Sequence, residues 1–414
     1  MTAVTSTPAA PLRLLWTLPY LPWPITSGGK ARQFHLIREL AERGHRITLL
    51  VQSKTELDDD TRRVLAPLLE DLIVLPRRPL KHPLTLWHAA TSSLPLLATV
   101  NGYAPALSAR FAQLLRSQRW DAVQIEHSYG FAPFEAELRA TGQPFIVTEH
   151  NVESELGAAT YGKWPAALRG LATYDQFRAR RWERRALSQA SAVVAVTEAD
   201  AHALGQISGR PTHVVSNGVD TRGFARVTPD PSSATALFVG NYEYAPNVDA
   251  VEWALTEVWP RVWALNPALR FRICGHGLPD AWRQRFPDPR IDWMGYVPDL
   301  TEVQACSAAF VAPLRFGGGS KLKVLEAMAA SLPLISTPEG LSGLDAVDGV
   351  HARVARDAPA MAQAIVHTLT HPEDAAAMGQ AARALVRERF DWSRAASQLE
   401  AVYASLTAAQ PRAA

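Results

Sequence analysis

Short apolar runs alternate with helical patterns twice along this chain, and this alternation restricts the fold more than any other feature. Apolar runs that read as β-strands lie at 12–18, 46–51, 72–75, 122–125, 145–148 and 192–196. Continuous apolar character of this kind is typical of parallel strands covered on both faces. The alternation restarts at 236–239, and further strands are predicted near 269–274, 290–294, 308–312 and 332–336. The predicted fold class is therefore α/β, with two doubly wound parallel sheets.

The length of 414 residues exceeds what a single hydrophobic core commonly holds, so two domains are expected. The turn-rich passage NGVDTRGFARVTPDPSS at 217–233 is predicted to be the linker between a domain at 1–216 and a domain at 234–390. Helices are predicted near 29–43, 83–118 and 164–190, then near 247–265, 299–306 and 321–330, with three more helical segments from about 359 to 406.

Composition excludes several classes of function. The net charge of +2 argues against a protein that binds nucleic acid in bulk. Cys274 and Cys306 are the only cysteines and form no CxxC motif, which fits a reducing cytoplasm. No apolar run approaches about 20 residues and no secretory signal is evident, so we expect neither a transmembrane helix nor export.

A glycine-rich turn in the second half is the strongest candidate for a ligand site. Gly317, Gly318 and Gly319 leave bare backbone before a helix that is expected to begin near Lys321. A helix N-terminus offers unpaired N–H groups and partial positive charge, so it suits an anion. The hydroxyl of Ser320 and the ammonium groups of Lys321 and Lys323 would lie at the same place.

Glu326 follows on the same predicted helix, where its carboxylate can accept hydrogen bonds from the vicinal hydroxyls of a sugar. Phosphate donors and a ribose acceptor at one helix end indicate a nucleotide-sugar site. An ordinary βα turn remains the alternative, although three consecutive glycines cost conformational entropy.

A glycine pair, Gly28 and Gly29, stands between the first predicted strand and helix, where ligands bind in open α/β sheets. Lys30 and Arg32 follow it on the helix. The segment lacks the GxGxxG fingerprint, so an enzyme that uses a nicotinamide cofactor is disfavoured. A tight turn is the alternative.

Two histidines end predicted strands of the first domain, His127 in DAVQIEH and His150 in VTEHNVE. The end of a parallel strand places such a side chain at the ligand edge of the sheet, although a solvent-facing histidine is the alternative. Glu126 and Glu149 each precede one of these histidines, and neighbours on a strand point to opposite faces. We therefore rank His150 and Glu149 as supporting or acceptor-side candidates.

The motifs GGGSKLKVLEAMA, PLIST and GLSGL at 317–344 resemble the donor-site signature of glycosyltransferase family 4. DAVQIEH, VTEHNVE, VVAVTEAD, VVSNGVD and LFVGNYEYAPNVDAVEW are similar to further landmarks of that family, in the family's order. The resemblance implies the GT-B fold, in which two Rossmann-like domains face a cleft. It also implies that the C-terminal helix at 391–414 crosses back to the N-terminal domain.

The resemblance assigns roles to individual positions. His127 would contact the reacting sugar, and Gly28, Arg32 and His150 would lie on the acceptor side. The positions that would bind the donor are Gly29, Gly240, Asn241, Val297, Gly317, Gly318, Gly319, Ser320, Lys321, Lys323 and Glu326.

The sequence departs from the family pattern at two places. The family commonly has an Arg and a Lys after the strand at 236–239, whereas NYEYAPNVDAVE contains neither, so Lys321, Lys323 and Arg315 are the candidate substitutes. Many members also have a glutamate eight residues before the ribose-binding one, and Gly318 occupies that position.

The resemblance implies transfer of a sugar from a nucleotide diphosphate sugar to a glycan or lipid-linked acceptor with retention, in cell-envelope or exopolysaccharide synthesis. It implies no metal and no cofactor beyond the nucleotide sugar, no nucleic-acid partner, and a cytoplasmic location with peripheral contact at the inner face of the membrane. The alternatives are a nucleotide-sugar epimerase of the same fold and a catalytically silent sugar-binding scaffold.

Two further patterns are interpreted conservatively. The D-x-D spacing in Asp58–Asp59–Asp60 matches a metal–diphosphate motif, but helix capping is the preferred interpretation. The basic cluster of Arg178, Arg180, Arg181, Arg184 and Arg185 could meet anionic lipid, and a solvated helix surface is preferred.

Overall fold

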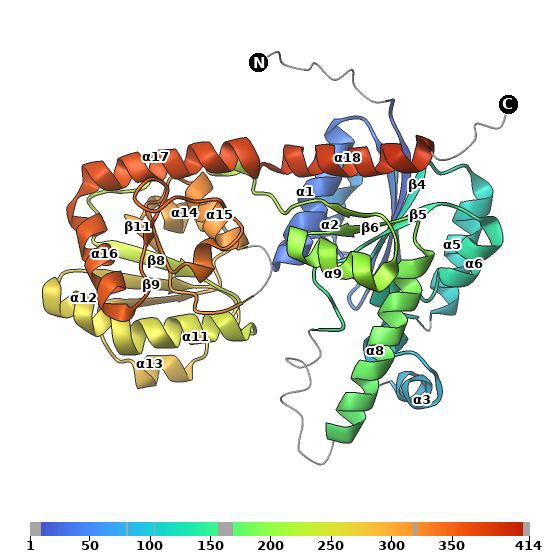
Figure 1. The fold of residues 1–414 in the computed structure, drawn as a ribbon, viewed down its shortest axis with the longest axis horizontal. Helices are drawn as coiled ribbons and strands as arrows, with labels where there is room; N and C mark the ends of the chain where they lie inside the picture. Colours follow the sequence, from blue (N-terminus) through green and yellow to red (C-terminus); the bar gives the residue numbers. More distant parts are fainter. Residues whose placement is uncertain (1–9, 80–81, 103, 156–168, 318–320, 409–414) are drawn as a thin grey trace. The chain divides into compact units, whose positions relative to one another are not determined.

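The computed structural model describes residues 10–79, 82–102, 104–155, 169–317 and 321–408. The chain divides into two compact units, one of Met1–Ser216 with Ala396–Ala414 and one of Asn217–Ala395 (Figure 1). The turn-rich passage at 217–233 belongs to the second unit, where Val219 forms a bridge to Asp391.

The first unit is built on a parallel sheet of seven strands in the order β3-β2-β1-β4-β5-β6-β7. The strands are β1 (Arg13–Leu18), β2 (Arg46–Ser53), β3 (Asp71–Pro76), β4 (Ala122–Glu126), β5 (Phe145–Thr148), β6 (Ala192–Ala195) and β7 (Thr212–Val214). Central strands such as β4 and β5 are buried along their whole length, which explains the apolar sequence of β5 up to Thr148, whereas β4 also buries the polar side chains of Gln124 and Glu126.

Helices pack around this sheet (Figure 1). They are α1 (Gly28–Glu42), α2 (Asp59–Leu65), α3 (Pro83–Thr91), α4 (Leu96–Gly102), α5 (Pro105–Ser117), α6 (Glu135–Thr141), α8 (Arg169–Gln189) and α9 (Glu198–Ser208), with most of α18 (Trp392–Ala408). The side chain of Ser27 caps α1 by accepting from the Lys30 N–H, and Gly44 follows the helix with a φ of +88°.

The C-terminal part of α18 packs within the first unit. The Tyr403 hydroxyl donates to the Gln124 side chain of β4, and the His45 ring lies 2.8 Å from the Glu400 carboxylate. Arg43 donates to the Ser397 hydroxyl at 2.9 Å.

The second unit repeats the architecture with six parallel strands in the order β10-β9-β8-β11-β12-β13. The strands are β8 (Thr235–Val239), β9 (Arg270–Cys274), β10 (Ile291–Gly295), β11 (Ala309–Ala312), β12 (Leu334–Ser336) and β13 (Arg353–Val354). The helices include α10 (Thr221–Phe224), α11 (Ala245–Trp253), α12 (Trp259–Leu265), α13 (Ala281–Arg285), α14 (Leu300–Ala305), α15 (Leu322–Ala329), α16 (Ala358–Thr370) and α17 (Pro372–Arg389). Each unit has its own hydrophobic core.

The predicted strands are confirmed, while the short edge strands β7 and β13 were not predicted. The helix predicted at 83–118 is divided into α3, α4 and α5, because prolines at 95 and 105 stand at or just before helix starts. The helix predicted at 247–265 contains a π-helical turn at Ala254–Val258 between α11 and α12.

Strand order reverses between β1 and β4 in the first unit and between β8 and β11 in the second. In open α/β sheets, ligands bind outside the carboxyl ends of strands at such a switch point. The topology therefore identifies one ligand-binding edge in each unit.

Candidate functional site

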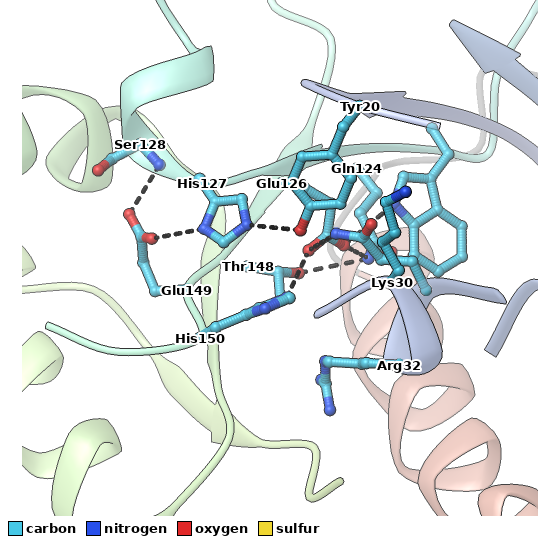
Figure 2. Close-up of polar contacts among 12 residues, drawn as sticks. Tyr20, Lys30, Arg32, Gln124, Glu126, His127, Ser128, Thr148, Glu149 and His150 are labelled. Atoms are coloured by element: carbon cyan, nitrogen blue, oxygen red, sulfur yellow. Dashed lines mark hydrogen bonds and ion pairs between the residues drawn. The ribbon is translucent and has the colours of Figure 1, made fainter. Parts of the chain in front are cut away.

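The switch point of the first unit brings together residues from three strand ends. Tyr20 and Gly29 follow β1, His127 follows β4 and His150 follows β5. The rings of His127 and His150 lie 4.4 Å apart between centroids, and the Tyr20 hydroxyl lies 3.4 Å from Nε2 of His127. Two histidines that are 23 residues apart in sequence thus share one site (Figure 2).

His127 adopts a strained backbone conformation, with a φ of +64°. Positive φ is rare for residues other than glycine and persists where surrounding contacts hold it. The His127 N–H donates to the Thr148 carbonyl of β5 at 2.9 Å, and the ring stacks on Tyr129 with centroids 4.7 Å apart. The strain therefore occurs at the residue that the sequence singled out.

Carboxylates lie behind the His127 ring. Its Nδ1 lies 3.7 Å from Glu149 and 3.3 Å from Glu153, while Tyr20 approaches the opposite nitrogen (Figure 2). The Ser128 N–H donates to Glu149 at 2.7 Å. Burial lowers the pKa of His127, but the Tyr129 and Tyr20 oxygens and these two carboxylates raise it well above its ordinary value. The imidazolium form is thereby favoured.

Glu126 ends β4 with a buried carboxylate that accepts several hydrogen bonds. The donors are the side chains of Trp16 at 3.0 Å, Gln124 at 2.6 Å, Gln33 at 3.4 Å and His150 at 3.1 Å. Burial raises the pKa of Glu126, but the hydrogen bond from His150 and the surrounding positive charge bring it to about 2. The Glu126–His150 and Glu149–His127 pairs were missed at the sequence level, because they join residues on neighbouring strands.

His150 behaves in the opposite way to His127. Burial lowers its pKa to about 4, and the neighbouring charge of His127 acts in the same direction. At neutral pH the site therefore combines a neutral His150, which donates to an ionised Glu126, with a His127 that tends to carry charge.

The N-terminal end of α1 lies close to these rings. A Cβ on Gly29 would lie 2.8 Å from the Tyr20 hydroxyl and 3.4 Å from the His150 ring, so only glycine fits without displacement. Gly28 begins the helix, and Lys30 reaches the Pro24 carbonyl at 3.2 Å. The α1 N-terminus thus lies close to Tyr20 and His150.

Arg32 is 1% exposed, and its guanidinium donates to the Ser216 carbonyl at 3.1 Å. Burial lowers its pKa to about 10, while Glu126 counteracts this shift. An acceptor-side role for Arg32 stays a prediction.

Among the residues that the structure describes, two groups of ligand atoms lie close enough to share a cation, with all atoms of each group within 4.8 Å of one another. One contains Glu126, His127 and His150, and the other contains His127, Glu149 and Glu153. In the first group, hydrogen bonds from Trp16 and Gln124 already occupy the Glu126 carboxylate. Mutual pairing of these residues accounts for the first group.

The switch point of the second unit brings together the ends of β8 and β11. Gly240 and Asn241 follow β8, and Gly317 lies in the turn after β11. A Cβ on Gly317 would lie 3.1 Å from Pro246 at the start of α11, and its φ is +132°. The predicted positions Gly318, Gly319 and Ser320 lie outside the described residues.

Lys323 of α15 reaches toward the end of β8. Its ammonium donates to the Asn247 side chain and lies 4.9 Å from the Phe238 ring centroid. Asn247 in turn donates to the Asn241 carbonyl at 2.7 Å. A cation from α15 therefore lies at the loop in which the sequence has neither Arg nor Lys.

Glu326 lies one turn beyond Lys323 on the same half-buried stretch of α15. Burial lowers the pKa of Lys323 to about 7, partly offset by Glu326. Burial raises the pKa of Glu326 to about 7, partly offset by Lys323. Both side chains therefore change charge near neutral pH. Such strongly shifted pKa values are uncommon in proteins and are found most often at functional positions.

The other basic candidates are engaged in contacts. Lys321 precedes α15 and donates to the Gly317 carbonyl at 2.7 Å and to Glu339 at 3.1 Å. Arg315 forms a two-point pair with Asp249, which lies on α11. Of the three cations considered at the sequence level, Lys323 is the one placed at the end of β8.

Val297 follows β10 and packs in part against the core of the second unit. Its predicted contact with the base stays a prediction. Nearby, a Cβ on Gly275 would lie 1.6 Å from the Gly240 carbonyl oxygen. Backbone of β9 and β8 thus meets too closely here for any side chain.

The conservative interpretation of the aspartate triplet is confirmed. Asp58 is the N-cap of α2 and accepts from the Thr61 N–H at 2.7 Å. Among the described residues, no helix has the length and apolar character needed to cross a membrane.

Two family models match the chain. The model described as Glycosyltransferase Family 4 matches residues 26–222, and the one described as Glycosyl transferases group 1 matches residues 233–371. Together they include the ends of β4, β5, β8 and β11, whereas β1 precedes the first match.

Two relatives are similar in sequence. A phosphatidyl-myo-inositol mannosyltransferase of Mycolicibacterium smegmatis is 30% identical over 211 residues, which are 47% of this chain and 52% of that protein. The match thus spans about half the length of that mannosyltransferase. An uncharacterised 44.6 kDa protein from the cps region of Klebsiella pneumoniae is 20% identical over 390 residues, 91% of this chain and 96% of that protein.

Solved structures share the fold. Sucrose-phosphate synthase from Thermosynechococcus elongatus has a TM-score of 0.70 at 17% identity, covering 96% of this chain and all of that one. HepE of Anabaena in complex with UDP-glucose has a TM-score of 0.62 at 15% identity, covering 95% and 100%. The prediction of two Rossmann-like domains of the GT-B class is confirmed.

Proposed function

Since the chain belongs to glycosyltransferase family 4, we propose that it transfers a sugar from a nucleotide diphosphate sugar to a glycan or lipid-linked acceptor, with retention at the anomeric carbon. The observation that carries the proposal is that Lys323 and Glu326 stand one turn apart on α15, which follows β11 at the switch point of the second unit. An ammonium suits a diphosphate, and a carboxylate one turn away suits a ribose.

We assign the nucleotide diphosphate to the loops after β8 and β11. Lys323 would stabilise the charge that develops on the departing diphosphate, which is electrostatic catalysis. Glu326 would accept from ribose hydroxyls. Gly240, Asn241 and Gly317 would allow close approach of the phosphates to the backbone.

We assign the hydroxyls of the donor sugar to the histidine side of the first unit. A largely charged His127 would donate to a hydroxyl of the donor sugar. A neutral His150, whose Nε2–H donates to Glu126, would accept a hydrogen bond at Nδ1 on the acceptor side. The departing diphosphate oxygen would take the acceptor's proton on the same face, which gives retention.

The relatives indicate which classes of acceptor and pathway should be tested. The mannosyltransferase of Mycolicibacterium smegmatis is named for a lipid acceptor, and the Klebsiella relative is encoded in a cps region. We therefore infer a hexosyl transfer at the cytoplasmic face of the membrane in envelope or exopolysaccharide synthesis.

The test is nucleotide release by the purified full chain from a panel of UDP-, GDP-, ADP- and dTDP-sugars, with Glu326→Ala and Lys323→Met beside the wild type. We expect slow release from one donor, reduced at least a hundredfold in both variants. The exposed Lys54→Met and Glu257→Gln variants serve as controls and should keep full activity.

Absence of both release and a donor-induced thermal shift across the panel would overturn the proposal and favour a scaffold. A shift without release, unchanged in Glu326→Ala, would also count against the assigned nucleotide site.

A further inference from the structure

An exposed apolar surface lies on the first unit, outside the residues assigned to sugar transfer. Half of the exposed large apolar side chains among the described residues lie on α3, the start of α4 and the first half of α8. They are Leu84, Leu86, Trp87, Leu97, Leu171, Tyr174 and Phe177. Trp87 is 64% exposed and Leu171 is 60% exposed. Contiguous apolar patches on a protein surface mark interaction sites.

These helices are fixed against one another. The Arg178 guanidinium on α8 donates to the carbonyls of Ala89 and Ser92 at the end of α3, at 2.8 and 3.0 Å. Asp175 accepts from the Leu96 N–H at the start of α4, at 3.0 Å. Figure 1 shows α3 beside the part of α8 that extends below the sheet. The apolar side chains are therefore presented by a braced surface.

The sequence of α3, PLTLWHAAT, contains no Lys, Arg, Asp or Glu. On α8, Leu171, Tyr174 and Phe177 recur at intervals of three residues, so they share one face of the helix. That face continues at Arg181 and Arg184, and the Arg181 guanidinium lies 5.7 Å from the Phe177 ring centroid.

The charge at this surface has one sign. Arg169, Arg180, Arg181 and Arg184 are exposed, and none has an acidic partner in the part of the chain that the structure describes. The acids of α8, Asp175 and Glu183, are both buried. Neither α3 nor α4 contains a carboxylate.

We infer that α3, the start of α4 and the outward face of α8 form a docking surface for a bilayer of anionic phospholipid. Leucine and aromatic side chains bordered by arginine are the composition that lies in a membrane interface, with rings at headgroup level and guanidinium groups on phosphates. A cationic surface without exposed carboxylates complements an anionic membrane. The positive charge and the apolar character of this surface thus identify the partner, and neither observation depends on the sugar-transfer proposal.

The test is co-sedimentation of the full chain with vesicles of phosphatidylcholine containing 30% phosphatidylglycerol and with vesicles of phosphatidylcholine alone. We expect binding to the anionic vesicles at least tenfold tighter, weakened by high salt. Trp87→Glu with Phe177→Glu should reduce this binding at least tenfold. Arg180→Gln, Arg181→Gln and Arg184→Gln together should remove the preference for anionic lipid.

Leu265→Glu is the matched control, because Leu265 is 58% exposed in the second unit. It should bind vesicles like the wild type. Circular dichroism verifies that each variant is folded, and a fold-neutral single change, Trp87→Ser, replaces the double variant if that one unfolds. Wild-type chain that stays in the supernatant, variants that bind equally well, or a wild-type dimer that Trp87→Glu dissociates would each overturn the inference.

Discussion

The Nε2 atom of His150 lies 3.1 Å from Oε2 of Glu126, so the ends of two neighbouring parallel strands share one buried hydrogen bond. The pKa of Glu126 is about 2 and that of His150 is about 4. At neutral pH the carboxylate is ionised and the ring is neutral, which makes the His150 N–H the donor. This pair fixes the position of a ring that faces Gly29 and His127.

The same pair predicts how the first unit responds to acid. The folded protein holds His150 in its neutral form. The contribution of His150 to the free energy of unfolding is therefore complete above its ordinary pKa of 6.5 and is lost as pH falls toward 4. Glu126 contributes above 4.5 and loses its contribution as pH falls toward 2. We expect His150 alone to lower the unfolding free energy by on the order of 3 kcal/mol between pH 6.5 and 4, while Glu183, whose pKa burial raises to about 7, acts in the opposite direction.

Urea denaturation at pH 7, 5.5 and 4 measures this loss. His150→Gln keeps a donor to Glu126 but does not titrate, so its stability should decline less over that range. Equal pH dependence in the variant and the wild type would contradict the predicted role of His150.

Backbone crowding in the second unit gives a second prediction. A Cβ on Gly275 would lie 1.6 Å from the Gly240 carbonyl oxygen, and its φ of +137° also disfavours other residues. Gly275→Ala should cost at least about 3 kcal/mol, because backbone atoms cannot move aside as a side chain can.

Thermal unfolding compares Gly275→Ala with Gly349→Ala. Gly349 has a φ of +74° but nothing within 4 Å of its would-be Cβ, so this control retains the strain without the clash. Similar losses in the two variants would show that crowding at Gly240 is unimportant.

The sequence predicted the repeated α/β architecture well, because buried central strands such as β5 and β11 are almost entirely apolar. The strands β7 and β13 have three and two residues and are only partly buried, so they leave too weak a pattern. His127 and His150 were found because they follow strands within two residues, and the glycines because they stand in the turns between a strand and a helix or at the start of that helix.

The pairings inside the site could not be predicted in the same way. Glu149 meets His127, and Lys323 meets Asn247, across distances of 22 and 76 residues, so these contacts depend on the order of strands and on packing. The loop after β8 contains no cation, and Lys323 shows that another helix, α15, can place one beside it.

A third prediction concerns the charge on His127. Its raised pKa depends in part on Glu149, whose carboxylate also accepts from the Ser128 N–H at 2.7 Å. Glu149→Gln keeps the shape and the acceptor but removes the negative charge. The pKa of His127 should therefore fall, since burial then opposes the imidazolium with less compensation.

The measurement is the pH profile of nucleotide release together with the NMR titration of the His127 ring. With the donor at saturating concentration, the wild type should lose the activity that depends on His127 as pH rises through the raised pKa, and the variant should lose it at lower pH. His127→Gln should lack this limb of the profile. An unshifted His127 titration in Glu149→Gln would contradict the assigned electrostatic role.

The last prediction follows from the pKa of about 7 at Lys323. Burial disfavours its ammonium form, while a bound diphosphate would favour it, so binding at pH 7.5 should draw a proton from solution. The affinity for a nucleotide sugar should fall as pH rises above about 7. A nucleotide sugar is the proper ligand, because its diphosphate diester does not titrate in this range.

Calorimetry in two buffers of different ionisation enthalpy counts the protons, and we expect an uptake of roughly half a proton or more per ligand bound at pH 7.5. Lys323→Met should abolish the uptake and weaken binding at least tenfold, whereas Lys54→Met, an exposed lysine of the first unit, should change neither. Undiminished proton uptake in Lys323→Met would show that another group takes up the proton. Glu326, whose pKa is also about 7, would then be the next candidate, and Glu326→Gln would test it.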